Sequence, residues 1–189
     1  MLFSLRATGQ DVTLVITNSG TSAAAWGTSY SFFDFEGSKW STTGGVLLGD
    51  GFDPSQPTYK FLLPPPSLAA GTRELVGLSI KIYGDGGSFG GGDAYISGIN
   101  VGQLSTSESW NTFTYTGSSA RALLTYAGAG KPYELTVTLD VTATEDQFDL
   151  KEIVVEYTYR GVPVEALRGY HLAAGAEAGI SRFRNTIGA

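Results

Sequence analysis

Cysteine is absent from this 189-residue chain, which also contains only one histidine and one methionine. Without cysteine there is no disulfide, no thiol nucleophile and no thiolate metal site. The single histidine is His171, and no Gly-x-Ser-x-Gly elbow between a strand and a helix accompanies it. A serine nucleophile activated by histidine is therefore not expected.

Charge is also scarce, because Asp, Glu, Lys and Arg make up only 16% of the residues. The net charge of −6 is acidic, which argues against binding to a nucleic-acid backbone. No segment has 18 consecutive apolar residues, and no basic-then-apolar signal peptide opens the chain. We therefore expect no membrane partner and synthesis in the cytoplasm.

Two long segments alternate between apolar and polar residues with a period of two. The first is 133–141 and the second is 153–160. Successive side chains of a strand point to opposite faces, so each segment describes a strand with one buried and one wet face. Tyr59, Phe61 and Leu63 alternate in the same way before three prolines. These patterns predict an antiparallel β-protein.

Further strands are predicted at short intervals, with no helix between them. The predicted strands include 12–17, 30–35, 46–48, 75–83, 94–101, 110–116 and 122–126. Such spacing is typical of an all-β antiparallel sandwich or jelly roll of about 8–10 strands. We assign residues 1–161 to this domain. The glycine-rich segment 84–93 is predicted to be a long flexible hairpin tip, because a strand and not a helix follows it.

The pattern changes after Gly161, and residues 162–189 are predicted to form a partly helical C-terminal arm. Gly169 and Gly175 would weaken a free helix there. We expect the arm to become ordered against a partner, with a frayed tail as the alternative. The residues expected to contact the partner are Leu167, Tyr170, Ile180, Arg182, Phe183 and Arg184.

Catalytic and metal sites find little support in the sequence. Glu152 and Glu156 share a strand face but would lie roughly 13 Å apart along it, farther than the two carboxylates of a glycosidase. A closer pair with Glu134 or Asp140 on another strand stays open, so a glycosidase or lyase is an alternative to a non-enzyme. No cofactor is expected. The candidates for calcium ligands are Asp85, Asp93, Asp146 and Asp149. They do not belong to a regular calcium-binding loop.

Aromatic residues offer another kind of site. Tryptophan and tyrosine present a large apolar face with a polar handle, which suits a sugar ring. The candidates for such a sugar platform are Trp26, Trp40, Tyr59 and Trp110. The competing interpretation is that these rings fill the core.

The compact acidic body, the missing histidine chemistry and the small-residue arm together resemble virion structural proteins of tailed bacteriophages. The resemblance is one of composition, covers the whole chain and involves no motif. It implies a β-sandwich capsid decoration protein or tail component, located in the virion and docked through its arm. Its partners would be copies of itself and other particle proteins. The alternative function is a carbohydrate-binding module or lectin that binds a surface glycan.

Overall fold

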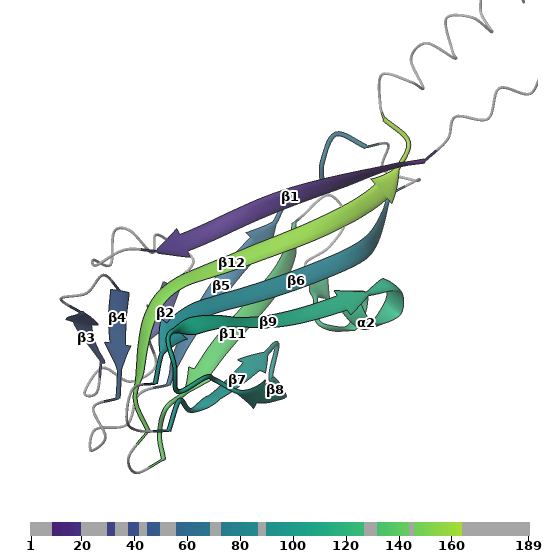
Figure 1. Ribbon diagram of the computed structural model, residues 1–189. Coiled ribbons are helices and arrows are strands. Elements are labelled where there is room, and N and C mark those ends of the chain that lie inside the picture. The colour runs from purple at the N-terminus through teal and green to yellow at the C-terminus, as the bar shows by residue number, and fades with distance from the viewer. Residues whose placement is uncertain are drawn as a thin grey trace, which may run out of the picture. The chain divides into compact units, whose positions relative to one another are not determined.

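The computed structural model (Figure 1) describes residues 9–19, 30–32, 38–41, 45–49, 56–68, 73–86, 90–126, 132–143 and 146–163. The chain divides into two compact units. The smaller unit contains residues 1–12, 65–74 and 159–189, and the larger contains residues 13–64 and 75–158. Among the described residues, no helix is long and apolar enough to cross a membrane.

Antiparallel strands make up most of the described chain and form two sheets (Figure 1). Sheet A has the order β3-β4-β12-β6-β9, with β1 also paired to β12, and sheet B has the order β2-β5-β11-β7-β8, with β10 also paired to β11. The strands of sheet A are β1 (Gln10–Ser19), β3 (Ser38–Ser41), β4 (Gly45–Leu48), β6 (Glu74–Asp85), β9 (Ser109–Thr116) and β12 (Phe148–Gly161). Those of sheet B are β2 (Tyr30–Phe32), β5 (Pro57–Leu63), β7 (Asp93–Ile96), β8 (Ile99–Gln103), β10 (Thr125–Tyr126) and β11 (Tyr133–Asp140). The predicted all-β antiparallel sandwich is confirmed.

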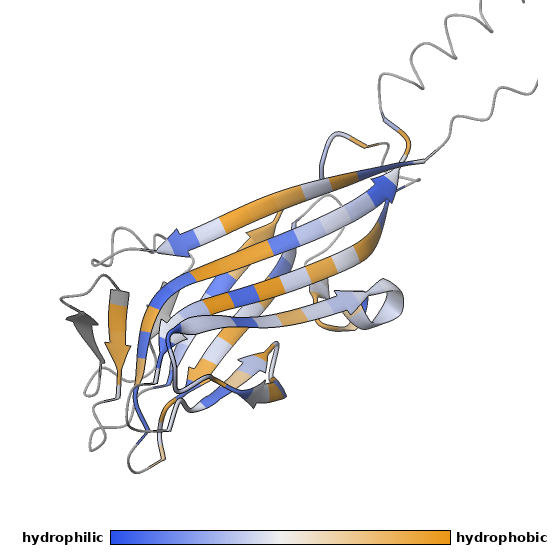
Figure 2. Cartoon of the chain, viewed as in Figure 1, coloured by the Kyte–Doolittle hydropathy of each residue, from blue (hydrophilic) through white to orange (hydrophobic). Residues whose placement is uncertain are grey.

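The core of the larger unit follows from the period of two (Figure 2). Alternate residues of β5, β6, β11 and β12 are buried, and the residues between them face outward. The fully buried residues include Phe61, Ile80, Leu135 and Val155. Burying a side chain of this size contributes about 1.5–3 kcal/mol. The two sheets are therefore joined by their inner faces, which leaves two outer faces exposed to solvent.

A change of phase divides β12 into two parts. Phe148 and Leu150 are buried in the first part, and Ile153 and Val155 continue the buried row in the second. Two consecutive residues, Lys151 and Glu152, lie between the rows and are only partly buried. The alternation of buried and outward residues therefore changes phase between Leu150 and Ile153. Lys151 follows the buried Leu150 and therefore points to the outer face, where it belongs to the candidate site.

Two of the predicted strands are wrong in detail. The predicted strand 94–101 is a hairpin, because Ser97 and Gly98 adopt φ values of 49° and 80° and turn the chain between β7 and β8. Positive φ at both residues is the mark of a tight hairpin turn. The predicted strand 122–126 instead begins in the short helix α2 (Gly117–Ala122) and continues in β10.

The glycine-rich segment 84–93 is not a hairpin tip, since β6 and β7 belong to different sheets. Its described glycines serve close packing. A Cβ atom on Gly84 would lie 2.5 Å from the Asp149 carbonyl oxygen, and one on Gly91 would lie 2.3 Å from the Leu104 carbonyl oxygen. Glycine therefore lets the crossing chain approach other backbone closely.

The last described residues of the chain, up to Pro163, belong to the smaller unit. Arg160 donates from Nε and Nη2 to the Asp11 carboxylate at 2.8 and 3.0 Å, and this contact lowers the pKa of Asp11. Leu68 forms an isolated bridge with Pro163. The six predicted arm contacts, from Leu167 to Arg184, lie outside the described residues, so the arm and its boundary at 162 stay predictions.

Candidate functional site

Trp110 of β9 in sheet A is exposed, with 46% of its surface accessible. Its register partner on β6 is Tyr83. Residues directly opposite on antiparallel strands point to the same face, so both rings lie on the outer face of sheet A. The ring centroids are 4.9 Å apart and the ring planes are tilted by 30°. The two rings therefore form one continuous aromatic surface.

Charged groups flank the tyrosine side of this surface. The Tyr83 hydroxyl donates to Glu108 Oε1 at 2.7 Å, and Lys151 Nζ donates to the same oxygen at 2.7 Å. The Lys151 ammonium also lies 5.8 Å from the centre of the Tyr83 ring, within the range of a cation–π interaction. We call Tyr83, Glu108, Trp110 and Lys151 the Trp110 site.

Strand pairing and one braced turn hold these four side chains together. Lys151 on β12 points to the outer face, and its ammonium lies beside the Tyr83 ring on β6. Hydrogen bonds brace the loop that holds Glu108, since Ser107 N donates to Ser105 Oγ at 3.1 Å and Ser109 Oγ donates to the Ser107 carbonyl at 3.0 Å. Serine hydroxyls of this kind stabilise tight turns. The site is thus held by the β6–β9 strand pair, by β12 and by a braced turn.

The protonation states in the Trp110 site follow from its hydrogen bonds. Donation from Lys151 and Tyr83 lowers the pKa of Glu108, so its carboxylate is ionised at neutral pH. Lys151 donates a hydrogen bond to Glu108, and this raises the pKa of Lys151. Tyr83 donates to the same carboxylate, and this raises the pKa of Tyr83. The site therefore presents a neutral phenol, a carboxylate and an ammonium group beside the indole ring.

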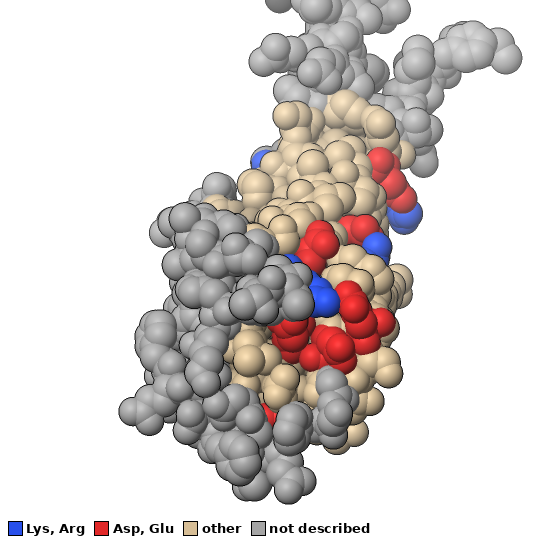
Figure 3. Space-filling view, turned by 60° about the vertical axis from the view of Figure 1, so that its left-hand side comes forward, with Lys and Arg blue, Asp and Glu red and all other residues tan. Residues whose placement is uncertain are grey.

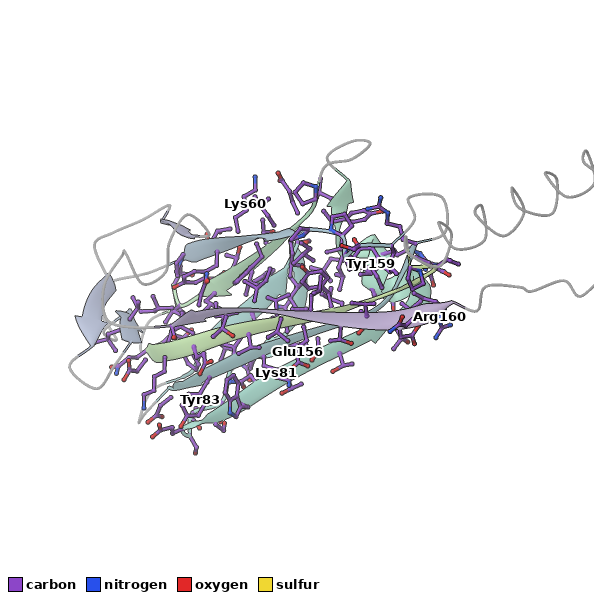
Figure 4. All side chains as sticks on the ribbon, turned by 90° about the horizontal axis from the view of Figure 1, so that it is seen from above. Lys60, Lys81, Tyr83, Glu156, Tyr159 and Arg160 are labelled. Atoms are coloured by element: carbon purple, nitrogen blue, oxygen red, sulfur yellow. The ribbon has the colours of Figure 1, made fainter. Side chains whose placement is uncertain are left out.

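The rest of this outer face is polar and rich in hydroxyl groups. Ser79 and Thr114 form one cross-strand pair, and Thr13 and Thr158 form a hydrogen bond of 2.9 Å. Lys81 and Glu156 form an ion pair of 2.8 Å. Figure 4 shows these two side chains meeting on the same side of the layers as Tyr83, with Lys60 on the other side. The aromatic surface is therefore set among polar groups.

No protein-family model matches the sequence, and no curated protein matches it. Several solved structures are similar, however. They include a CBM36-1 domain of a multidomain xylanase from the hindgut metagenome of Trinervitermes trinervoides, at 10% identity and a TM-score of 0.38 over 76% of this chain and 96% of that one. A family 29 carbohydrate-binding module from Piromyces equi is 9% identical over 77% of this chain and 90% of that one, and a CBM35 from Paenibacillus barcinonensis is 10% identical over 74% and 97%, each with a TM-score of 0.38.

These comparisons contradict the prediction of a virion structural subunit. The similar structures include several carbohydrate-binding modules, and none of those reported is a virion protein. The prediction rested on composition, which many acidic β-sandwiches share. At these TM-scores the similar structures place no ligand site on this chain. The residues on its own surface indicate what it could bind.

The four residues predicted to form a sugar platform differ in their exposure to solvent or lie outside the described part of the chain. Tyr59 is wrong, since its side chain is fully buried beside Phe61 and Leu63 in the core. Trp26 lies outside the described residues, as does the side chain of Trp40 in β3. Trp110 is exposed, and its role in binding a sugar stays a prediction. Sequence reasoning missed its three companions because they come from separate segments.

The carboxylate pair that the sequence left possible, between β12 and β11, is not formed. Glu152 and Glu156 belong to sheet A, whereas Glu134 and Asp140 belong to sheet B and point to its outer face. Glu156 is paired with Lys81, and Glu134 is paired with Lys60 at 2.8 Å. A two-carboxylate centre between these strands is therefore excluded.

The calcium candidates are all described, and within the described part of the chain no group of three or more His, Cys, Asp or Glu residues could hold a metal ion. Asp93 and Asp146 do lie with Asp140 around a depression of about 270 Å³. Burial raises the pKa of Asp146, and the neighbouring carboxylates of Asp93 and Asp140 raise it further. The three side chains repel one another.

The raised pKa of Asp146 predicts a pH-dependent cost to stability. The folded protein binds this proton more tightly than the unfolded chain, so the contribution to the free energy of unfolding falls as the pH rises from the ordinary Asp value through the raised pKa. Asp146→Asn is expected to stabilise the fold at pH 7 and to change it little at pH 3. Urea unfolding at both pH values measures this. An equal effect at both would contradict the assignment.

Proposed function

We propose that this chain is a non-catalytic carbohydrate-binding module that holds a sugar ring against Trp110. The observation that supports this is the exposed Trp110–Tyr83 surface with a braced ion pair at its edge. A sugar ring has an apolar face of C–H groups and a rim of hydroxyls. The indole and phenol rings match the face, and Glu108 and Lys151 match the rim.

The surroundings favour a sugar over a protein partner. The other large hydrophobic residues that are exposed in the described chain are Val15, Leu62 and Ile99. Leu62 and Ile99 belong to sheet B, and two strands of sheet A separate Val15 on β1 from β9. Among the described residues, therefore, no broad apolar patch extends from Trp110, whereas a protein interface usually needs one at its centre. Figure 3 shows acidic and basic side chains interspersed on the surface.

The site is also prepared before a ligand arrives. Glu108 accepts two hydrogen bonds, from Tyr83 and Lys151, and this fixes all three side chains. Tyrosine and tryptophan each have two side-chain torsions, so little rotational freedom is lost on binding. Such preorganisation improves affinity by lowering the entropic cost of association.

A glycan array probed with the wild-type chain tests the proposal. The array should carry neutral, amino and acidic oligosaccharides, and saturable binding to at least one class is expected. Leu62→Ala is the matched control, because it truncates a similarly exposed apolar side chain on sheet B. It should give the same array profile as the wild type. A wild-type array without saturable binding to any glycan would contradict the proposal.

Tyr83 provides a graded prediction for the same site. Tyr83→Phe keeps the ring beside Trp110 but removes the hydroxyl that donates to Glu108. We expect a loss in affinity of about 2- to 10-fold, in line with one hydrogen bond of about 0.5–1.5 kcal/mol. Tyr83→Ala removes the ring as well and should cost more. Isothermal titration with an oligosaccharide selected on the array measures both, and equal losses would show that the ring makes no contact.

A further inference from the structure

A second polar surface lies on the outer face of sheet B, away from the Trp110 site. Thr58 on β5 is opposite Thr138 on β11, and Thr138 is also opposite Tyr95 on β7. Directly opposite residues share a face, with Cβ atoms about 4.5–5.5 Å apart. The two threonine hydroxyls are hydrogen-bonded at 2.8 Å. Three strands thus present two hydroxyl groups and a phenol ring in one row.

This row forms the floor of an open depression of about 470 Å³. Its lining residues, which we call the sheet B depression, are Gln56, Thr58, Tyr95, Gly98, Thr138 and Asp140. The volume falls within the range of small-molecule sites. The lining combines hydroxyls, an amide, a carboxylate and one aromatic ring.

The hairpin turn keeps one side of the depression open. Gly98 has a φ of +80°, and a Cβ atom placed on it would meet nothing within 4 Å. The side chain of Ser97 is directed elsewhere, since its hydroxyl donates to the Leu123 carbonyl. The turn is therefore anchored on one side and leaves space beside Tyr95 on the other.

The charges around the depression restrict its ligand. Asp140 is part of the lining, and its register partner on β7 is Asp93. Asp146 is close enough to both for their carboxylates to raise its pKa. The Asp140 carboxylate of the lining, with Asp93 and Asp146 around the neighbouring depression, disfavours an anionic ligand. A carboxylate, an amide and two hydroxyls suit the neighbouring hydroxyls of a neutral sugar.

We propose that the sheet B depression is a second sugar-binding site, selective for an uncharged sugar ring stacked beside Tyr95. The inference rests on the proposed function for its class of ligand, but it uses none of the residues of the Trp110 site. Because the two sites lie on the outer faces of different sheets, one molecule would hold two separate glycan chains. Binding to a dense polysaccharide would then exceed binding to a short oligosaccharide through avidity.

Amide chemical-shift mapping by NMR tests this on the whole chain. The probes are xylohexaose, mannohexaose and cellohexaose, with hexagalacturonate as the anionic comparison, each raised to millimolar concentration. The variants are Trp110→Ala for the first site and Tyr95→Ala and Thr138→Val for the second. Val15→Ala, an exposed truncation on sheet A outside both sites, is the control.

We expect a neutral hexaose to shift the amides of both the Trp110 site and the sheet B depression. Trp110→Ala should abolish only the first set of shifts, and Tyr95→Ala or Thr138→Val only the second. Hexagalacturonate should leave the amides of Gly98, Thr138 and Asp140 unmoved. Val15→Ala should behave like the wild type.

The contrary outcomes separate the two proposals. Shifts confined to the Trp110 site, or depression shifts that vanish in Trp110→Ala, would overturn the second site and leave the proposed function standing. Shifts confined to the depression would overturn the Trp110 site and leave the second site standing. Depression shifts with hexagalacturonate would overturn the selectivity, and no shifts with any probe would overturn both sites.

Discussion

Trp110→Ala is expected to lower the affinity for a bound oligosaccharide about 30-fold, equivalent to about 2 kcal/mol, the loss typical of a central aromatic contact. The variant removes the larger of the two rings and leaves Tyr83 without its stacking partner at 4.9 Å. The indole is 46% exposed before any ligand binds, so its removal opens no cavity in the core. The free energy of unfolding should change by less than about 1 kcal/mol.

Two companion variants make this result specific. Trp110→Phe keeps an aromatic ring at the same position and should retain part of the affinity. Leu62→Ala truncates a side chain that is 50% exposed on sheet B, and its affinity should match that of the wild type. Isothermal titration gives the affinities. An unchanged affinity in Trp110→Ala would remove this residue from the site.

Phe61→Ala is expected to lower the free energy of unfolding by about 3–5 kcal/mol, the range measured for large aromatic truncations in cores. Phe61 is fully buried in β5, which pairs with β2 and β11 inside sheet B. Its register partner on β11 is Leu135, which is also fully buried. The variant therefore leaves a cavity between well-packed strands, and the surrounding structure relaxes only partly around it.

The neighbouring residue provides the control. Leu62 points to the outer face, so Leu62→Ala should change the free energy of unfolding by only about 0.5 kcal/mol. Urea denaturation monitored by circular dichroism measures both variants, with the midpoint shifted and the slope unchanged. Similar losses for the two variants would mean that β5 does not alternate between core and solvent as described.

Sequence periodicity predicted the long strands well. The alternating segments at 133–141 and 153–160 correspond to β11 and the second part of β12, and 110–116 corresponds to β9. Alternate residues are buried in β11 and in the second part of β12, and in β9 partly buried residues alternate with exposed ones, so burial and sequence share the same period. The burial of β12 changes phase at Lys151–Glu152, which a strict period of two does not reveal.

Turns and short elements were harder to predict. Ser97–Gly98 sits inside an apolar run, and its two-residue turn divides the run into β7 and β8. Ser-Gly is a recognised turn signal, so local sequence did contain this information. The helix α2 begins at Gly117, whose φ is +56°, and places Ala120 in the core. A six-residue helix is too short to show a helical period.

The candidate site depended on long-range register. Tyr83 and Trp110 are brought together only because β6 and β9 pair with those residues opposite each other. Lys151 comes from a third strand, β12, and no spacing in the sequence encodes these contacts. Tyr59 could have been assigned to the core from sequence alone, since it alternates in phase with Phe61 and Leu63.

The indole N–H resonance of Trp110 tests the central claim most directly. It can be assigned in the wild-type spectrum by its disappearance in Trp110→Phe. Titration with an oligosaccharide that binds on the array should move this resonance saturably, with the same dissociation constant that calorimetry gives. An indole resonance that stays at its free position while calorimetry detects full binding would contradict the account.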